Sequence, residues 1–142
     1  MRFHYEQLHI TTHSPIEIID LSAEIKDLMS HHPLRQGWMH IASAHTTAFI
    51  AINERELELQ LDMLDFLQRI APPGQGYRHD RNPLDERPNT HSHLIGLFMN
   101  SSETLLIENG RLLLGDWQSV FLIELDGPRL ERRVHIQIAG IP

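Results

Sequence analysis

The chain has 142 residues and a formal charge of −7, with 19 acidic and 12 basic side chains. Its hydrophobic content of 41% can supply one core, so we expect a single domain over residues 1–142 that needs no disulfides or structural metal. The acidic balance offers no basic face to a phosphate backbone, which argues against nucleic acid as a partner. The lack of cysteine excludes thiolate nucleophiles and thiolate metal ligands.

The amino-terminal stretch, MRFHYEQLHITT, alternates polar and apolar side chains. It contains neither a signal-peptide apolar region nor the run of roughly 20 apolar residues that crosses a bilayer. We therefore expect a soluble, cytoplasmic protein with no membrane partner. The alternation predicts a half-buried strand over residues 2–12, with an irregularity near Gln7.

Two amphipathic helices are predicted. Apolar side chains recur at three- and four-residue spacing over residues 16–30, and His31-His32-Pro33 ends this pattern. The second helix runs from Glu54 to Ile70, and its apolar residues form two seams that cover more than half of its circumference. Such a helix needs two partners. One is its own sheet, and the other is either the interior of the same chain or a neighbouring subunit.

Short apolar runs rich in β-branched residues predict the strands. Residues 71–88 hold half of the chain's eight prolines and predict a long loop, and Asn89 begins a short helix. The expected strands after the first are residues 37–43, 46–52, 103–108, 111–115 and 117–125, and a last strand from Arg132 to Gly140. Hairpin-like strands with two or three helices indicate an α+β fold with a mostly antiparallel β-sheet.

The eleven histidines do not define a site by number, and most are expected to be structural. Four adjoin loops and polar residues and are candidates for a site: His45, His79, His91 and His93. No pair has the four-residue spacing of a metal-binding helix, so a site must be assembled by tertiary folding. His91 and His93 are rotated by about 200° on a helix, so at most one of them points into a given pocket.

Neutral imidazoles with a carboxylate such as Glu54 suit Zn²⁺ or a related divalent ion. No P-loop or GxGxxG is present, so phosphate recognition would depend on scattered groups. Arg129 and Ser92 are the candidates, although Arg129 also fits an ordinary surface turn. Trp117 and Gln118 can line a ligand pocket, although a tryptophan is more often part of the core.

Five segments in this order resemble the YjbQ-like family, whose members are named secondary thiamine-phosphate synthases: HTTAFIAINE, YRHD, NTHSHL, LLLGDWQSVFLIELDGPR and VHIQIAG. The resemblance covers residues 5–140. It implies a compact α+β fold, a homotrimer with sites near subunit boundaries, and a histidine-rich pocket with a divalent metal, Zn or Mg/Mn.

The resemblance also implies roles for residues of this chain. The expected catalytic residues are His45, Glu54 and Arg129, the metal ligands are His45, His79 and His93, and the ligand-binding residues are Thr46, Asn89, Trp117 and Gln118. His93 is favoured over His91, and Glu54 is expected close enough to His45 to assist or orient it. The LERR segment leaves Arg132 and Arg133 as alternatives for a second basic position.

The implied reaction joins a pyrimidine diphosphate to a thiazole phosphate with release of pyrophosphate, as a weak or promiscuous activity. Two other classes stay open. One is a metal-dependent hydrolase of a small phosphorylated metabolite with Glu54 as general base, and the other is a non-catalytic trimer that binds a metal or metabolite. Glu54→Gln separates them, because only an enzyme that uses this base loses turnover while it retains ligand.

Overall fold

The computed structural model describes residues 1–142, which form eight strands and four helices. The strands are β1 (Arg2–Ile10), β2 (Glu17–Asp20), β3 (Gln36–Ser43), β4 (Ala48–Glu54), β5 (Ser102–Glu108), β6 (Arg111–Leu112), β7 (Gln118–Glu124) and β8 (Arg132–Ile141), and the helices are α1 (Ser22–His31), α2 (Leu57–Ile70), α3 (Arg78–Arg81) and α4 (Thr90–Gly96). Every strand pair is antiparallel. The predicted α+β fold is confirmed, and the one-turn helix α3 is the addition to the two or three helices expected.

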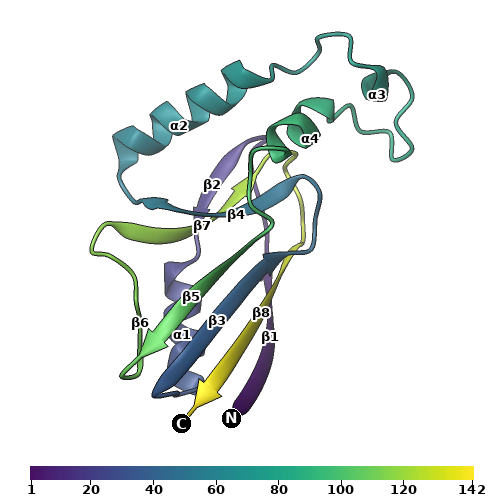
Figure 1. Ribbon diagram of the computed structural model, residues 1–142. Helices are drawn as coiled ribbons and strands as arrows, with labels where there is room; N and C mark the ends of the chain where they lie inside the picture. Colours follow the sequence, from purple (N-terminus) through teal and green to yellow (C-terminus); the bar gives the residue numbers. More distant parts are fainter.

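The strands form two sheets. The larger has the order β1-β8-β3-β5-β6, and the smaller has the order β2-β7-β4. β1 pairs with β8 without interruption from Arg2 opposite Gly140 to Ile10 opposite Arg132, so the irregularity expected near Gln7 is absent. The two chain termini consequently lie side by side (Figure 1).

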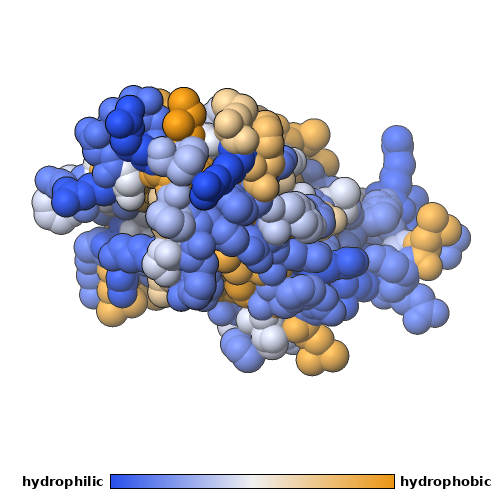
Figure 2. Space-filling view, turned by 90° about the horizontal axis from the view of Figure 1, so that it is seen from below, coloured by the Kyte–Doolittle hydropathy of each residue, from blue (hydrophilic) through white to orange (hydrophobic).

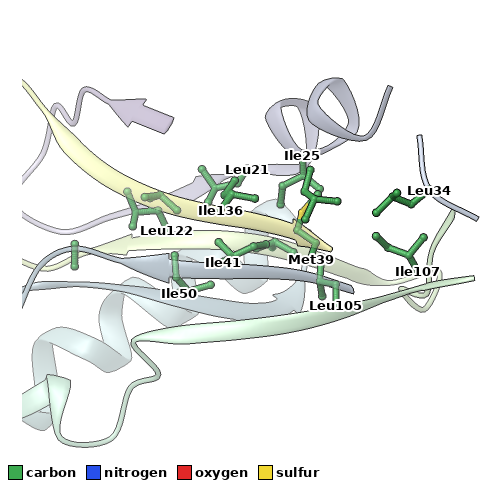
Figure 3. Packing of buried hydrophobic residues seen from close by; sticks show 14 residues of the cluster. Leu21, Ile25, Leu34, Met39, Ile41, Ile50, Leu105, Ile107, Leu122 and Ile136 are labelled. Carbon is green, nitrogen blue, oxygen red and sulfur yellow. The ribbon is translucent and has the colours of Figure 1, made fainter. Parts of the chain in front are cut away.

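The small sheet is buried on both faces. Ile50 and Leu122 belong to the core between the two sheets and α1, whereas Phe49 and Phe121 belong to a second cluster with residues of α2 and α4. Figure 3 shows the first cluster, in which side chains of α1 point toward the strands. Because successive residues of a strand face opposite sides, burial on both faces explains why β4 and β7 are nearly continuous apolar runs.

The helix predicted over residues 16–30 is wrong in its first part. Residues 17–20 form β2, which pairs with β7 from Glu17 opposite Glu124 to Asp20 opposite Phe121. Ile18 packs against one core cluster and Ile19 against the other, which is the burial of a strand between two layers. The Asp20 carboxylate then accepts a hydrogen bond from the Ser22 N–H at 2.8 Å, where α1 begins.

Helix α2 starts at Leu57, three residues later than predicted, because Glu54 still pairs with Gln118 in the small sheet. The Glu56 carboxylate accepts hydrogen bonds from two backbone N–H groups of the first turn. The helix crosses above β4 and β7 (Figure 1) and fully buries only one side chain, that of Leu67. Several large apolar side chains stay exposed on α2: Leu57, Leu61, Phe66 and Ile70.

The segment between α2 and α4 is a loop apart from α3. Asp80 of α3 accepts hydrogen bonds from the backbone N–H and the hydroxyl of Thr90, at 3.1 and 2.6 Å. These bonds tie the loop to the first residue of α4 and place the loop beside that helix end (Figure 1). They also lower the pKa of Asp80, chiefly through the Thr90 hydroxyl.

No helix combines the length and apolarity needed to span a membrane. Seen from below, the surface is mostly hydrophilic and its apolar side chains form separate patches (Figure 2). The strand predicted over residues 111–115 is only Arg111–Leu112, which follows a two-residue turn. Asn109 and Gly110 both have positive φ there, as this kind of hairpin requires.

Candidate functional site

A polar pocket of about 260 Å³ opens where the β3–β4 turn meets the start of α4 and the turn after β7. One of its nine lining residues is hydrophobic, and the full set is Ala44, His45, Thr46, Thr47, Asp85, Asn89, His93, Arg129 and Arg132. Five of the residues predicted for the site are therefore brought together: His45, Thr46, Asn89, His93 and Arg129. A polar hollow with basic and hydroxyl groups is suited to a small anionic ligand.

The β3–β4 turn is shaped by Ser43. Its hydroxyl donates to the Ala48 carbonyl at 2.6 Å and accepts from the His45 N–H at 3.2 Å. The hydroxyl is thus engaged in the turn that presents His45 to the pocket. Ser92 is engaged likewise, because its buried hydroxyl donates to the Leu125 carbonyl. Neither serine offers a free hydroxyl to a phosphate.

His45 is held as a neutral hydrogen-bond donor. Its Nε2 accepts a hydrogen bond from the Arg133 backbone N–H at 2.8 Å, so in the neutral ring the proton is on Nδ1. Burial lowers the pKa of His45 below its ordinary value of 6.5, and the nearby guanidiniums, first of all that of Arg132, lower it further. At neutral pH this imidazole therefore supplies an Nδ1–H group.

A buried ion pair lies behind His45. Arg132 is 2% exposed and Glu124 is 0% exposed, and the guanidinium donates to both carboxylate oxygens. Thr12 donates to the same carboxylate at 2.8 Å, and Arg132 donates to the Thr47 hydroxyl at 2.9 Å. Burial alone would raise the pKa of Glu124, but these hydrogen bonds lower it. Of the two alternatives for a second basic position, Arg132 lines the pocket, whereas Arg133 does not and its side chain is exposed.

Asp126 organises the opposite wall. Its carboxylate accepts hydrogen bonds from Arg87 at 3.1 Å, Arg129 at 2.8 Å and the Asn89 amide at 2.7 Å. Burial works to raise the pKa of Asp126, and the hydrogen bonds from Arg87, Asn89 and Arg129 outweigh it, so the pKa is lowered. Gly127 follows within the turn, and a Cβ there would lie 2.1 Å from the Ser14 carbonyl oxygen. The close approach of two backbone segments thus requires glycine.

The Asp126 carboxylate also fixes the protonation of His79 through Asn89. Since a carboxylate only accepts, the Asn89 NH₂ group faces Asp126 and its oxygen faces His79 Nε2, 2.9 Å away. His79 must then donate from Nε2, and its Nδ1 keeps a lone pair. The His79 and His93 rings meet edge to face with centroids 5.2 Å apart.

The predicted metal ligands behave differently from one another. In neutral His79, Nδ1 keeps its lone pair, and the ring contacts that of His93. In neutral His45 the only lone pair is on Nε2, which already accepts from Arg133. No three histidine or carboxylate side chains converge in a way that could hold a metal ion. One chain therefore does not assemble the three protein ligands of a catalytic zinc site.

Glu54, Trp117 and Gln118 lie away from the pocket. Ala48, beside the pocket, pairs with Glu124, whereas Glu54 pairs with Gln118 at the other end of both strands. Six strand residues separate the ends by roughly 20 Å. The expectation that Glu54 orients His45 is therefore wrong within one chain. Trp117 is 75% exposed, so it is not a core residue either.

Gln118 and His91 are two further predicted or considered residues that do not line the pocket. The Gln118 side-chain oxygen accepts from the Gly115 N–H at 2.7 Å, which closes the turn around Trp117. His93 lines the pocket and His91 does not, which agrees with the expectation from their spacing on a helix. The His91 Nδ1 is buried without a hydrogen-bond partner. Burial is the main cause that lowers the pKa of His91.

Sequence reasoning did not identify Glu124, Asp126, Arg87, Thr47 or Asp85. Glu124 falls in the strand predicted over residues 117–125, and Asp126 follows it in the segment DGPR, whose Gly-Pro pair indicates a turn. Two carboxylates shortly before a Gly-Pro pair, with Arg129 directly after it, are the signal that was present. It could not show that one carboxylate would be fully buried, because burial depends on the packing of β7 against both neighbouring layers.

The sequence profile of the family described as UPF0047 protein YjbQ-like matches residues 6–141. A UPF0047 protein of Methanothermobacter thermautotrophicus is 34% identical over 142 residues, which cover 100% of this chain and 96% of that protein. The UPF0047 protein YugU of Bacillus subtilis is 33% identical over 134 residues, or 94% of this chain and 97% of YugU.

Crystal structures of similar proteins have the same fold. A YbjQ-like protein of unknown function from Sulfolobus solfataricus superposes with a TM-score of 0.91 at 29% identity, over 98% of each chain. An uncharacterized conserved protein of the yjbq/upf0047 family from Clostridium acetobutylicum gives a TM-score of 0.85 at 31% identity, over 94% of this chain and 99% of that one. The likeness spans the whole arrangement of two sheets and helices described above.

Proposed function

Because the chain belongs to the UPF0047 YjbQ-like family, we propose that its polar pocket binds a small phosphorylated metabolite and supports a weak thiamine-phosphate synthase activity. In that reaction the thiazole nitrogen bonds to the methylene carbon of the pyrimidine diphosphate. The bond from this carbon to the diphosphate oxygen breaks, and pyrophosphate leaves. The enzyme has to stabilise the negative charge that develops on the leaving group.

The observation that carries the proposal is that two ion pairs place their arginines, and not their carboxylates, in the pocket lining. Arg129 and Arg132 line the pocket, whereas their carboxylate partners, Asp126 and Glu124, do not. Asp85 is the one carboxylate in the lining. The wall thus presents the half-buried Arg129 guanidinium, with the buried Arg132 guanidinium behind it, although the chain as a whole carries a charge of −7. Such a wall attracts phosphate oxygens.

Further donors complete this proposed anion site. The Nδ1–H group of His45 and the exposed hydroxyl of Thr46 belong to the same lining. Arg129 is held by Asp126 through two hydrogen bonds, so it is positioned before a ligand arrives. Donors that are already ordered stabilise developing charge without further reorganisation.

A divalent ion, Zn²⁺ or Mg²⁺/Mn²⁺, is part of the proposal through His79 and His93. When bound, it would supply additional positive charge for the diphosphate. The roles of the chain's own residues do not depend on it: Arg129 binds a phosphate oxygen, His45 donates from Nδ1, and Asn89 keeps the proton of His79 on Nε2.

We also propose that the working unit is a cytoplasmic homotrimer. The exposed apolar side of α2 supplies surface for contact between copies, and Trp117 is an exposed aromatic residue of the kind found at interfaces. Within such a trimer, Glu54, Trp117 and Gln118 of one copy would approach the pocket of the next. In this arrangement the pocket residues and the Glu54 group belong to one site, although they lie roughly 20 Å apart within one chain.

The direct experiment supplies pyrimidine diphosphate and thiazole phosphate to the purified protein, with and without Mg²⁺, Mn²⁺ or Zn²⁺, and measures thiamine phosphate and pyrophosphate. Product formed by the wild type and lost in Arg129→Met supports the proposal. Absence of product under every condition, in protein that still binds pyrophosphate, would leave a binding protein and reject the synthase.

Subunit mixing tests the composite site. His45→Ala and Glu54→Gln chains are each expected to lose turnover, and mixed trimers are expected to recover part of it, because some sites then combine two intact halves. Recovery would place the two residues on different copies in one site. No recovery from verified mixed trimers would show that Glu54 does not act in a neighbour's pocket.

A further inference from the structure

A cavity of about 470 Å³ lies away from the histidine pocket of the same chain, between α1, the β5–β6 turn and the start of β7. It shares no residue with the pocket that contains His45. Cavities of this size accommodate whole small molecules. Gln118, one of the residues proposed for the synthase site, also lines this cavity.

The floor of this cavity is apolar. Ile25 of α1 and Val120 of β7 are buried core residues, and Met29, Leu112 and Leu114 are half-buried above them. A ligand that enters can therefore remove apolar surface from water. Burial of apolar surface favours binding.

The rim of the cavity is basic. Lys26, Arg55 and Arg111 line it with exposed side chains, and no aspartate or glutamate belongs to the lining. Lys26 and Arg111 form no ion pair, whereas Arg55 approaches the Asp20 carboxylate at 3.4 Å. At least two cations are thus free of a carboxylate partner in a chain that carries seven more negative than positive charges.

We propose that this cavity binds an amphipathic anion, a molecule with a carboxylate, sulfonate or phosphate group on an aromatic or aliphatic body. The apolar body lies against Ile25 and Val120, and the anionic group lies at the rim between Lys26 and Arg111. Exposed cations beside an apolar floor discriminate against neutral apolar molecules, which gain nothing from the rim, and against small inorganic anions, which gain nothing from the floor. Gln118 belongs both to this lining and to the composite site proposed above, whereas the binding argument here uses only the apolar floor and basic rim of one chain.

The probe is 8-anilinonaphthalene-1-sulfonate, compared with N-phenyl-1-naphthylamine, which has the same aromatic body without the sulfonate. We expect the wild type to bind the sulfonate at least tenfold more tightly, measured by fluorescence titration. In Lys26→Glu/Arg111→Glu, sulfonate affinity falls at least tenfold and the naphthylamine affinity changes little.

The matched control is Arg69→Glu/Arg81→Glu, which changes the net charge equally at two exposed arginines without ion pairs. It is expected to retain sulfonate affinity. Equal loss of sulfonate affinity in both double variants would show that overall charge alone causes the effect. No loss in Lys26→Glu/Arg111→Glu would show that the probe binds elsewhere. Either result overturns the proposal. Amide shifts of Ser22, Gly110 and Ser119 on titration give a second readout that does not depend on a variant.

Discussion

The backbone N–H of Arg133 donates a hydrogen bond to Nε2 of His45 at 2.8 Å. This contact decides what His45 can do, because it leaves Nδ1 as the protonated nitrogen of the neutral ring. We expect ¹H–¹⁵N correlation spectra to show the Nδ1–H tautomer, with a titration midpoint below 6.5. The Nε2–H tautomer, or a midpoint above 6.5, would contradict this assignment.

Arg132 and Arg133 are neighbours in sequence with opposite surroundings, which provides a matched pair of variants. Arg132→Met leaves the buried Glu124 carboxylate without its cation and is expected to lower the free energy of unfolding by about 3–5 kcal/mol. Arg133→Met alters an exposed side chain and is expected to change it by about 0.5 kcal/mol or less. Urea unfolding measures both.

The pairing of Arg132 with Glu124 can be checked further with Arg132→Met/Glu124→Gln. Removing the charge of both partners should recover part of the stability lost in Arg132→Met, because no buried charge then remains unpaired. Simple addition of the two single effects would show that the side chains contribute independently.

Asn89 connects Asp126 to His79, and its side chain is buried. Asn89→Ala leaves a buried carboxylate oxygen with one hydrogen bond fewer and is expected to cost about 1–3 kcal/mol of stability. The His79 proton should then distribute over both ring nitrogens. Asn82→Ala, at an exposed asparagine without side-chain hydrogen bonds, is the control and should change neither quantity. His79 retaining only the Nε2–H tautomer in Asn89→Ala would show that another group fixes it.

Acidification should destabilise the fold through His45 and His91. Both have folded-state pKa values below 6.5, so the unfolded chain binds protons more readily as the pH falls through 6.5. The free energy of unfolding therefore decreases as the pH is lowered through this range. We expect His91→Gln to lose less free energy of unfolding between about pH 7.5 and about pH 5.5 than the wild type does. His13→Gln, at an exposed side chain, should behave like the wild type. A steeper loss in His91→Gln would reverse the assigned sign.

The exposed side of α2 predicts self-association. Leu61→Glu introduces a charge among apolar side chains and should lower the mass in solution from that of the proposed trimer toward that of a monomer, measured by light scattering. Gln68→Glu adds the same charge at an exposed polar position of the helix and should leave the mass unchanged. An unchanged mass in Leu61→Glu would exclude this side of α2 from the interface.

Local patterns were sufficient for much of the fold. The strands around His45 and the last strand follow from short β-branched runs, and the apolar seams of α2 follow from helical spacing. The pattern over residues 16–20 misled, because consecutive isoleucines suit a helix as well as a strand that is buried on both faces. Only the packing of the small sheet between two layers shows that this segment is a strand and not a helix.

Part of the candidate site was predicted from the sequence. His45, Asn89, His93 and Arg129 were identified and do line one pocket. Glu54 was misplaced because adjacency in sequence does not reveal that a whole strand separates it from His45. Asp126 was overlooked because two of its three donors, Arg87 and Asn89, lie 39 and 37 residues earlier in the sequence.

Calorimetric titration with inorganic pyrophosphate tests the central claim, that the pocket recognises a phosphorylated ligand through Arg129, most directly. Binding by the wild type should weaken at least tenfold in Arg129→Met, since a charge-assisted hydrogen bond contributes about 1.5–3 kcal/mol. It should be unchanged in Arg81→Met, with thermal unfolding confirming that both variants are folded. Equal affinity of all three proteins, or no binding by the folded wild type, would contradict the account.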